Sequence, residues 1–173
     1  DDIYNLSARF RYFAHLLTAI TILLLSSLFK ELQVDYEGIV LILLFIFITI
    51  AITAIINIFN FMDGLDGFLA SNLSIAIVTI GVKYNFSILP LAAALIGFLV
   101  WNWPPAKVFM GDSGSTFLGA VYGSLMIQTT NLLETMEIIL ISFPILADGM
   151  ICIIRRYFAS YNIFKAHKHH LYQ

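Results

Sequence analysis

The sequence predicts an all-α fold, a polytopic integral membrane bundle of helices. Hydrophobic residues make up 60% of the 173 residues and charged residues only 12%, whereas soluble domains carry about 25% charged residues. Long stretches without charge recur along the chain, and they show no alternation of the kind that a β-barrel needs. Most of this chain is therefore expected to lie in lipid as helices.

Six stretches are candidate transmembrane helices, because roughly 17 to 20 apolar residues span the hydrocarbon core. The stretch 67–82 is the weakest of them, since it is short and contains Ser71, Asn72 and Ser74. The six stretches are 12–29, 38–62, 67–82, 84–106, 113–133 and 138–154.

The basic residues favour one orientation in the membrane. The net charge of -2 says little about partners, and no nucleic acid is expected among them. Of the nine Lys and Arg residues, only Lys30 and Lys83 fall on even-numbered connections between the expected spans. The positive-inside rule then places the odd-numbered connections in the cytoplasm.

Four polar islands interrupt the apolar sequence, and all four fall on odd-numbered connections. Acid-rich and glycine-rich loops at the ends of membrane spans suggest metal and phosphate chemistry at the membrane surface. Because the four islands are expected on the same side of the membrane, they predict a single site on the cytoplasmic side. The islands are Asp1–Asp2, Asn57 to Gly67, Pro104 to Ser115, and His167 to His170.

The island from Asn57 to Gly67 combines amides, carboxylates and glycines. Asn57 and Asn60 are three residues apart and share one stripe of a helix. Asp63 and Asp66, each followed by a glycine, could hold a divalent cation, hydrogen-bond a sugar or base, or accept a proton. The alternative is a polar turn in which Asp66 is the N-cap of the next helix.

The island from Pro104 to Ser115 begins with two prolines that end a helix. Backbone N–H groups at the following helix start favour phosphate, and Asp112 would repel phosphate unless a cation lay between them. This combination suggests Mg²⁺. Ser113 and Ser115 have an alternative role as helix caps, and Phe109 could stack on a nucleobase or lie at the membrane interface.

The histidine island and the two N-terminal aspartates have two interpretations each. His167, His169 and His170 would suit a diphosphate, a proton donor or a metal, or they could belong to a basic surface on anionic lipid headgroups. Asp1 and Asp2 repel each other and could supply a general base, or they could belong to an ordinary loop. His15, near an interface, is expected to be structural.

Taken together, these motifs resemble the polyprenyl-phosphate N-acetylhexosamine-1-phosphate transferases of glycosyltransferase family 4, relatives of phospho-N-acetylmuramoyl-pentapeptide transferase. The histidine tract is more similar to the bacterial branch that initiates O-antigen, common antigen or teichoic acid linkage units. The motifs are Asn57-x-x-Asn60-x-x-Asp63-Gly64-x-Asp66-Gly67, Pro105-Ala-x-x-Phe109-Met-Gly-Asp112-x-Gly-Ser115 and His167-x-His169-His170.

The resemblance implies transfer of an N-acetylhexosamine 1-phosphate from a UDP-sugar to undecaprenyl phosphate, with release of UMP and with Mg²⁺ or Mn²⁺ as cofactor. It also implies a multi-pass protein of the bacterial plasma membrane and leaves a homodimer open. Asp112 matches the metal ligand. Asp1 and Asp2 match a catalytic aspartate pair that supplies a base or nucleophile, and Asp63 and Asp66 match a catalytic aspartate pair near the nucleotide sugar. Positions matched to substrate binding are Asn57, Asn60, Asn102, Phe109, His167, His169 and His170.

Residues 1–173 are expected to form a single membrane domain, a fragment of a larger enzyme that has further spans at both ends. Three alternatives have a different function. A transporter would place ionisable groups near the bilayer midplane, and a CDP-alcohol phosphotransferase would need further aspartates after its first Asp-Gly. The third alternative is a scaffold that retains an inactive site.

Overall fold

A computed structural model describes residues 7–129 and 132–158. All regular secondary structure in these two ranges is helical, which confirms the all-α prediction. The chain divides into two compact units, residues 1–60 with 111–137 and residues 61–110 with 138–173. The expectation of a single membrane domain stays a prediction.

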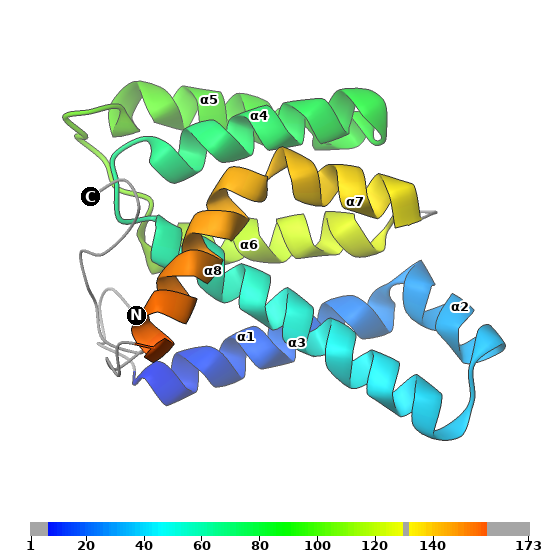
Figure 1. The fold of residues 1–173 in the computed structure, drawn as a ribbon. Helices are drawn as coiled ribbons and strands as arrows, with labels where there is room; N and C mark the ends of the chain where they lie inside the picture. The colour runs from blue at the N-terminus through cyan, green and yellow to red at the C-terminus, as the bar shows by residue number, and fades with distance from the viewer. Residues whose placement is uncertain (1–6, 130–131, 159–173) are drawn as a thin grey trace. The chain divides into compact units, whose positions relative to one another are not determined.

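The first unit contains α1 (Ala8–Leu25), α2 (Ser27–Asp35), most of α3 (Gly38–Met62), α6 (Gly111–Ile127) and the first part of α7 (Leu132–Ile141). Helices α1 and α6 begin at the same end of this unit and run in the same direction, while α3 runs the opposite way (Figure 1). Its apolar core joins these three helices through Ala19, Leu23, Ile52, Ile56 and Ile127.

Helices α3 and α6 approach each other closely because α6 carries glycines at the contact. A Cβ atom built on Gly119 would lie 2.8 Å from the Cα of Ile56. A Cβ atom on Gly123 would lie 3.1 Å from a methyl group of Ile52. This contact sets the register of α3 against α6, and so determines which side chains of α3 meet the start of α6.

Helices α1 and α3 are long and apolar enough to cross a membrane. Helix α3 also exposes Ile39, Leu43, Phe47 and Ile50, which recur at the spacing of one helix face. A large exposed apolar face is unusual on a soluble monomer. Both features agree with the predicted helical membrane protein.

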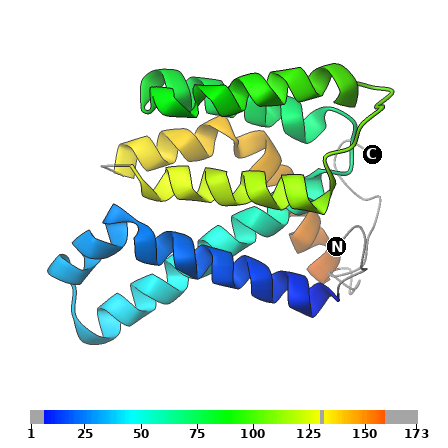
Figure 2. The ribbon, with the colours of Figure 1, turned by 180° about the vertical axis from the view of Figure 1, so that it is seen from behind.

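The second unit contains α4 (Phe68–Lys83), the short 3₁₀ helix η1 (Phe86–Ile88), α5 (Leu89–Asn102) and α8 (Phe143–Phe158). Helices α4 and α5 pack side by side as an antiparallel pair (Figure 2). Ser71, Asn72 and Ser74 each donate a hydrogen bond to a carbonyl of α4 itself. The polar side chains of the weakest expected span are therefore satisfied without water.

Each of the six expected stretches contains helix, but several helices are shorter than the stretch that predicted them. The first ends at Leu25, because Ser26 is extended and its hydroxyl accepts the N–H of Phe29 to start α2. The last is divided between α7 and α8, where Pro144 is the second residue of α8, a position that tolerates the missing N–H of proline. Arg9 and Arg11, expected on the first connection, lie inside α1.

The close contact at Gly119 generates the first prediction. In Gly119→Ala the added Cβ meets the backbone of Ile56, so α6 must move, at a cost of about 1–3 kcal/mol. Thermal unfolding in detergent should show a lower midpoint. Gly97→Ala is the matched control, because a Cβ at Gly97 of α5 meets nothing within 4 Å and alanine favours helix. A Gly119→Ala midpoint equal to that of the wild type would contradict the contact.

Candidate functional site

The start of α6 places Asp112 at a helix N-terminus. Gly111 begins the helix with φ of 69°, a left-handed conformation that side chains with a Cβ rarely adopt. Asp112 follows in the first turn, where the positive end of the helix dipole stabilises a carboxylate. Glycine and aspartate in this order therefore hold one negative charge at the end of the first unit.

Side chains from α1 and α3 donate to both carboxylate oxygens of Asp112. Nη1 of Arg11 lies 2.9 Å from Oδ2, and Nδ2 of Asn60 donates to Oδ1 at 3.0 Å. The same amide nitrogen donates to the buried hydroxyl of Ser115 at 3.1 Å. The Asp112 cluster, defined as Arg11, Asn60, Asp112 and Ser115, thus joins three helices through one carboxylate.

A second chain of hydrogen bonds fixes the ring of His15, one helical turn after Arg11. Nδ2 of Asn57 donates to the carbonyl of Thr53 at 2.8 Å, so Oδ1 of Asn57 points away from Thr53 and toward α1. That oxygen lies 3.2 Å from Nδ1 of His15. Because Oδ1 can only accept, Nδ1 must carry the proton, and Nε2 is the ring nitrogen left for other partners.

Asp112 is a candidate metal ligand in the described part of the first unit. Its side chain is 33% exposed, and each carboxylate oxygen has more than one lone-pair direction. Within the described ranges no three His, Cys, Asp or Glu side chains gather at one point, so the residues in these ranges do not by themselves form a complete cage. A site of one carboxylate completed by substrate phosphate oxygens fits Mg²⁺.

The second unit joins the two polar islands through a separate set of bonds. Oδ2 of Asp66 accepts the N–H of Ala106 at 2.9 Å. The Oδ1 atom of Asn102 accepts the N–H of Gly67 at 2.9 Å, and its Nδ2 donates to the carbonyl of Val108 at 2.9 Å. The loop that carries Asp66 is therefore held against the loop that precedes α6.

Two sequence-based interpretations of capping are wrong. Asp66 is not the N-cap of α4, since Gly67 occupies that position with φ of 72° and Asp66 bonds the neighbouring loop instead. Ser113 and Ser115 are not N-caps either, because α6 already begins at Gly111. The hydroxyl of Ser115 donates to the carbonyl of Gly111 inside the helix.

Sequence reasoning missed two residues of this site. Arg11 was interpreted as a basic residue of a connection and His15 as structural, yet both reach polar residues of the islands. The available signal was their spacing: Arg11 and His15 are four residues apart on α1 and face the same side. A cation and an imidazole on one face of an apolar helix need polar partners.

The remaining predicted site residues lie in the second unit or outside the described residues. Phe109 is 72% exposed in the second unit, and Asp63 is half-buried and has a partner within the protein. Whether Asp63 and Asp66 lie near Asp112 stays a prediction, as do the substrate contacts of the asparagines and Phe109. Outside the described residues lie Asp1, Asp2, His167, His169 and His170.

Comparison with known proteins identifies relatives of the chain. Residues 1–130 match the family model described as glycosyl transferase family 4. A Bacillus subtilis protein named "Probable undecaprenyl-phosphate N-acetylglucosaminyl 1-phosphate transferase" is 30% identical over 196 aligned residues, which cover 98% of this chain and 52% of the relative.

Two further relatives match over shorter regions. A Thermotoga maritima undecaprenyl-phosphate alpha-N-acetylglucosaminyl 1-phosphate transferase is 44% identical over 75 residues, 43% of this chain and 24% of the relative. A Clostridium beijerinckii phospho-N-acetylmuramoyl-pentapeptide-transferase is 37% identical over 91 residues, 47% of this chain and 28% of the relative. The chain thus spans about half the length, or less, of these relatives. No solved structure matches it.

The hydrogen bond between Asp66 and Ala106 predicts how the loop that precedes α6 responds to mutation. Asp66→Ala leaves the Ala106 N–H without its acceptor, so the loop should open more often, by about fivefold for a loss of about 1 kcal/mol. Trypsin cleavage after the exposed Lys107 measures this opening. Asp66→Asn keeps an acceptor oxygen and should be cleaved at nearly the wild-type rate. Equal rates for Asp66→Ala and wild type would show that this bond does not hold the loop.

Proposed function

Because this chain belongs to glycosyl transferase family 4, we propose that the whole protein transfers an N-acetylhexosamine 1-phosphate from a UDP-sugar to undecaprenyl phosphate. UMP is the second product. The Asp112 cluster carries the proposal, since it places a partly exposed carboxylate and a guanidinium at one end of apolar helices. The names of the Bacillus subtilis and Thermotoga maritima relatives support the same reaction.

The reaction is a phosphoryl transfer. An oxygen of the lipid phosphate forms a bond to the sugar-proximal phosphorus, and the bond from that phosphorus to the bridging oxygen breaks, so the bridging oxygen leaves with UMP. Such a transfer asks of the protein mainly positioning and charge stabilisation. One of Asp1 and Asp2, Asp2 in our proposal, keeps the lipid phosphate deprotonated.

Asp112 would hold Mg²⁺ or Mn²⁺ when the cofactor is bound. The metal supplies neutralisation of charge on the diphosphate. Arg11 orients one oxygen of the Asp112 carboxylate, and Asn60 fixes its other oxygen. The remaining predicted substrate residues are Asp63, Asp66, Asn57, Asn60, Asn102, Phe109, His167, His169 and His170.

The sugar transferred in our proposal is a simple amino sugar rather than a muramoyl peptide. The alignment with the Bacillus subtilis protein covers 98% of the chain, although one phospho-N-acetylmuramoyl-pentapeptide-transferase matches 72% of it, and the tract His167 to His170 resembles the branch that initiates cell-surface glycans. We therefore place the protein at the first membrane step of a cell-surface glycan. The distribution of Lys and Arg supports a multi-pass protein with its site facing the cytoplasm, and a homodimer stays a prediction.

The direct test uses the full-length protein in detergent. UMP release is measured with undecaprenyl phosphate, Mg²⁺ and a panel of UDP-GlcNAc, UDP-GalNAc and UDP-MurNAc-pentapeptide. We expect release with a UDP-N-acetylhexosamine that depends on the lipid phosphate. Release with the muramoyl peptide alone would move the protein to the other branch, and no release with any donor would contradict the transferase and favour a transporter or scaffold.

Replacing the predicted metal ligand should abolish turnover without unfolding the protein. Asp112→Asn keeps the shape of the side chain but loses the charge that holds Arg11 and the metal, so we expect a fall of at least about a hundredfold in metal-dependent UMP release. Asp35→Asn, an exposed acid at the end of α2, is the control and should retain full activity. A folded Asp112→Asn protein that turns over at a near-normal rate would refute the assignment.

A further inference from the structure

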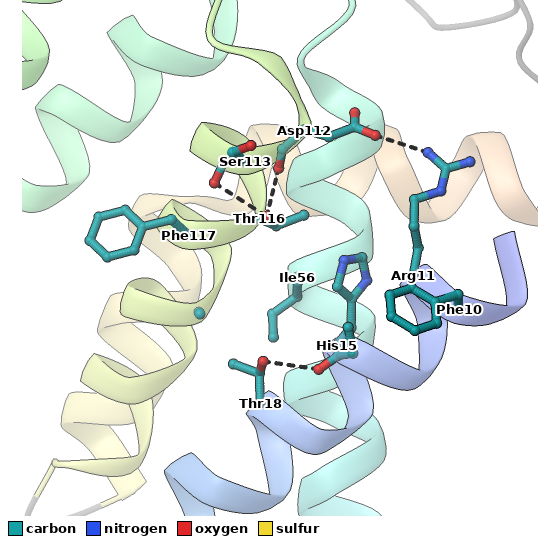
Figure 3. A pocket seen from close by; sticks show the side chains of 11 residues that line it. Phe10, Arg11, His15, Thr18, Ile56, Asp112, Ser113, Thr116 and Phe117 are labelled. Atoms are coloured by element: carbon teal, nitrogen blue, oxygen red, sulfur yellow. Dashed lines mark hydrogen bonds and ion pairs between the residues drawn. The ribbon is translucent and has the colours of Figure 1, made fainter. Parts of the chain in front are cut away.

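A pocket of about 430 Å³ lies toward the end of the first unit that is away from Asp112. It lies between α3 and α6, and residues of α2 and of the start of α7 also line it (Figure 1). It shares no lining residue with the groove beside the candidate site, which Arg11, His15 and Asp112 line (Figure 3). None of its lining residues is one that we assign to the transfer reaction, so that reaction does not account for the pocket.

Most of the lining of this pocket is apolar. Ile48 and Ile55 of α3 lie two helical turns apart, about 10 Å along the helix axis. Met126 of α6 and Leu28 of α2 extend the apolar wall. A wall of this length suits a run of hydrocarbon, whereas it would leave the hydroxyl groups of a sugar unsatisfied.

The polar groups of the lining differ in whether the protein already satisfies them. The hydroxyl of Thr129 donates to the carbonyl of Met126 at 2.9 Å and lies 2.6 Å from the hydroxyl of Thr135, so both threonines are bonded within the protein. Among the described residues that line the pocket, Glu31 alone is charged. Its side chain is exposed, and it forms no ion pair in the described part of the chain. The carboxylate of Glu31 is therefore the charged group that the pocket offers to a ligand.

The two segments at this end of the first unit are mostly acidic. Residues 26–38 and 132–137 together contain five acids and one basic residue. These residues are Lys30, Glu31, Asp35, Glu37, Glu134 and Glu137. A surface of this charge repels an anionic headgroup and attracts a cationic one. In the proposed orientation it faces the outer leaflet, so the charge selects among the headgroups of membrane lipids.

We propose that this pocket binds a membrane lipid whose headgroup carries a primary amine, such as phosphatidylethanolamine. The ammonium lies at the carboxylate of Glu31, and one acyl chain runs along Ile48 and Ile55 of α3 beside Met126 of α6. An ammonium supplies three N–H donors and the positive charge that this end lacks. An anionic lipid is the poorer occupant, because it brings net negative charge to an acidic surface. The proposal goes beyond the transfer reaction and does not depend on it.

A substitution at Glu31 separates the charge of the pocket from its shape. The full-length protein in detergent is titrated with dioleoyl phosphatidylethanolamine and with dioleoyl phosphatidylglycerol, and the affinity for the first lipid bound is measured by native mass spectrometry. We expect the wild type to bind phosphatidylethanolamine about fivefold more tightly, the effect of one solvent-exposed ion pair. Glu31→Gln keeps the shape of the side chain and loses its charge, so its affinities for the two lipids should agree within about twofold.

Two further variants test where the lipid binds. Asp35→Asn removes an acid of the same helix that does not line the pocket, so it should keep the wild-type preference. Ala51→Leu places a larger side chain in the pocket and should weaken the binding of both lipids at least about fivefold. The proposal is overturned if the wild type shows no preference, if Glu31→Gln keeps the preference, if Asp35→Asn loses it, or if Ala51→Leu binds both lipids as the wild type does.

Photolabelling locates the lipid directly and tests the rival occupants. The full-length protein is placed in vesicles of phosphatidylethanolamine and phosphatidylglycerol that contain a phosphatidylethanolamine with a diazirine in one acyl chain, and the labelled peptides are identified after irradiation. We expect label within residues 51–55 and 123–127, which contribute to the pocket. Label that misses both segments, the result if another span or a second copy of the chain fills the pocket, would overturn the proposal. None of these measurements uses UMP release, so the transfer reaction keeps its own test.

Discussion

The carboxylate of Asp112 is the point on which the first unit's site depends. It lies at the start of α6, and its two oxygens are held by a guanidinium from α1 and an amide from α3. The helix end and the guanidinium both place positive charge next to this carboxylate. Three helices that pack through an apolar core are therefore joined at one end by a single carboxylate, and a change of its charge acts on the site while the apolar core is retained.

Two polar islands coincide with places where the chain passes from one unit to the other. These two passages fall between residues 60 and 61 and between residues 110 and 111, and a third falls within α7, between residues 137 and 138. As a result, each unit contains part of the first island bonded to part of the second. Asn60 meets Asp112 in the first unit, and Asp66 meets Ala106 in the second. The two islands are thus joined twice, by independent sets of hydrogen bonds.

The sequence predicts the helices well because a long apolar stretch in lipid has few alternatives to helix. The expected stretch 38–62 and helix α3 agree at both ends. Elsewhere the helix ends depend on local hydrogen bonds, such as that to the hydroxyl of Ser26. A hydropathy pattern does not predict these bonds. The motifs also singled out Asp112 and Asn60, which the structure brings into contact, but not Arg11 and His15. Their roles depend on which face of α1 meets α3 and α6, and the contacts at Gly119 and Ile56 set that arrangement.

The asparagines of the islands explain why these segments mix amides with acids. An amide carries an acceptor and two N–H donors in one plane, so it can join two segments that a carboxylate, which only accepts, cannot join. Asn57 links Thr53 to His15, Asn60 links Ser115 to Asp112, and Asn102 links Gly67 to Val108. An aspartate in place of Asn60 would set two negative charges about 3 Å apart, and one would have to take up a proton. The amides therefore join neighbouring segments within each unit without adding negative charge next to Asp112 or Asp66.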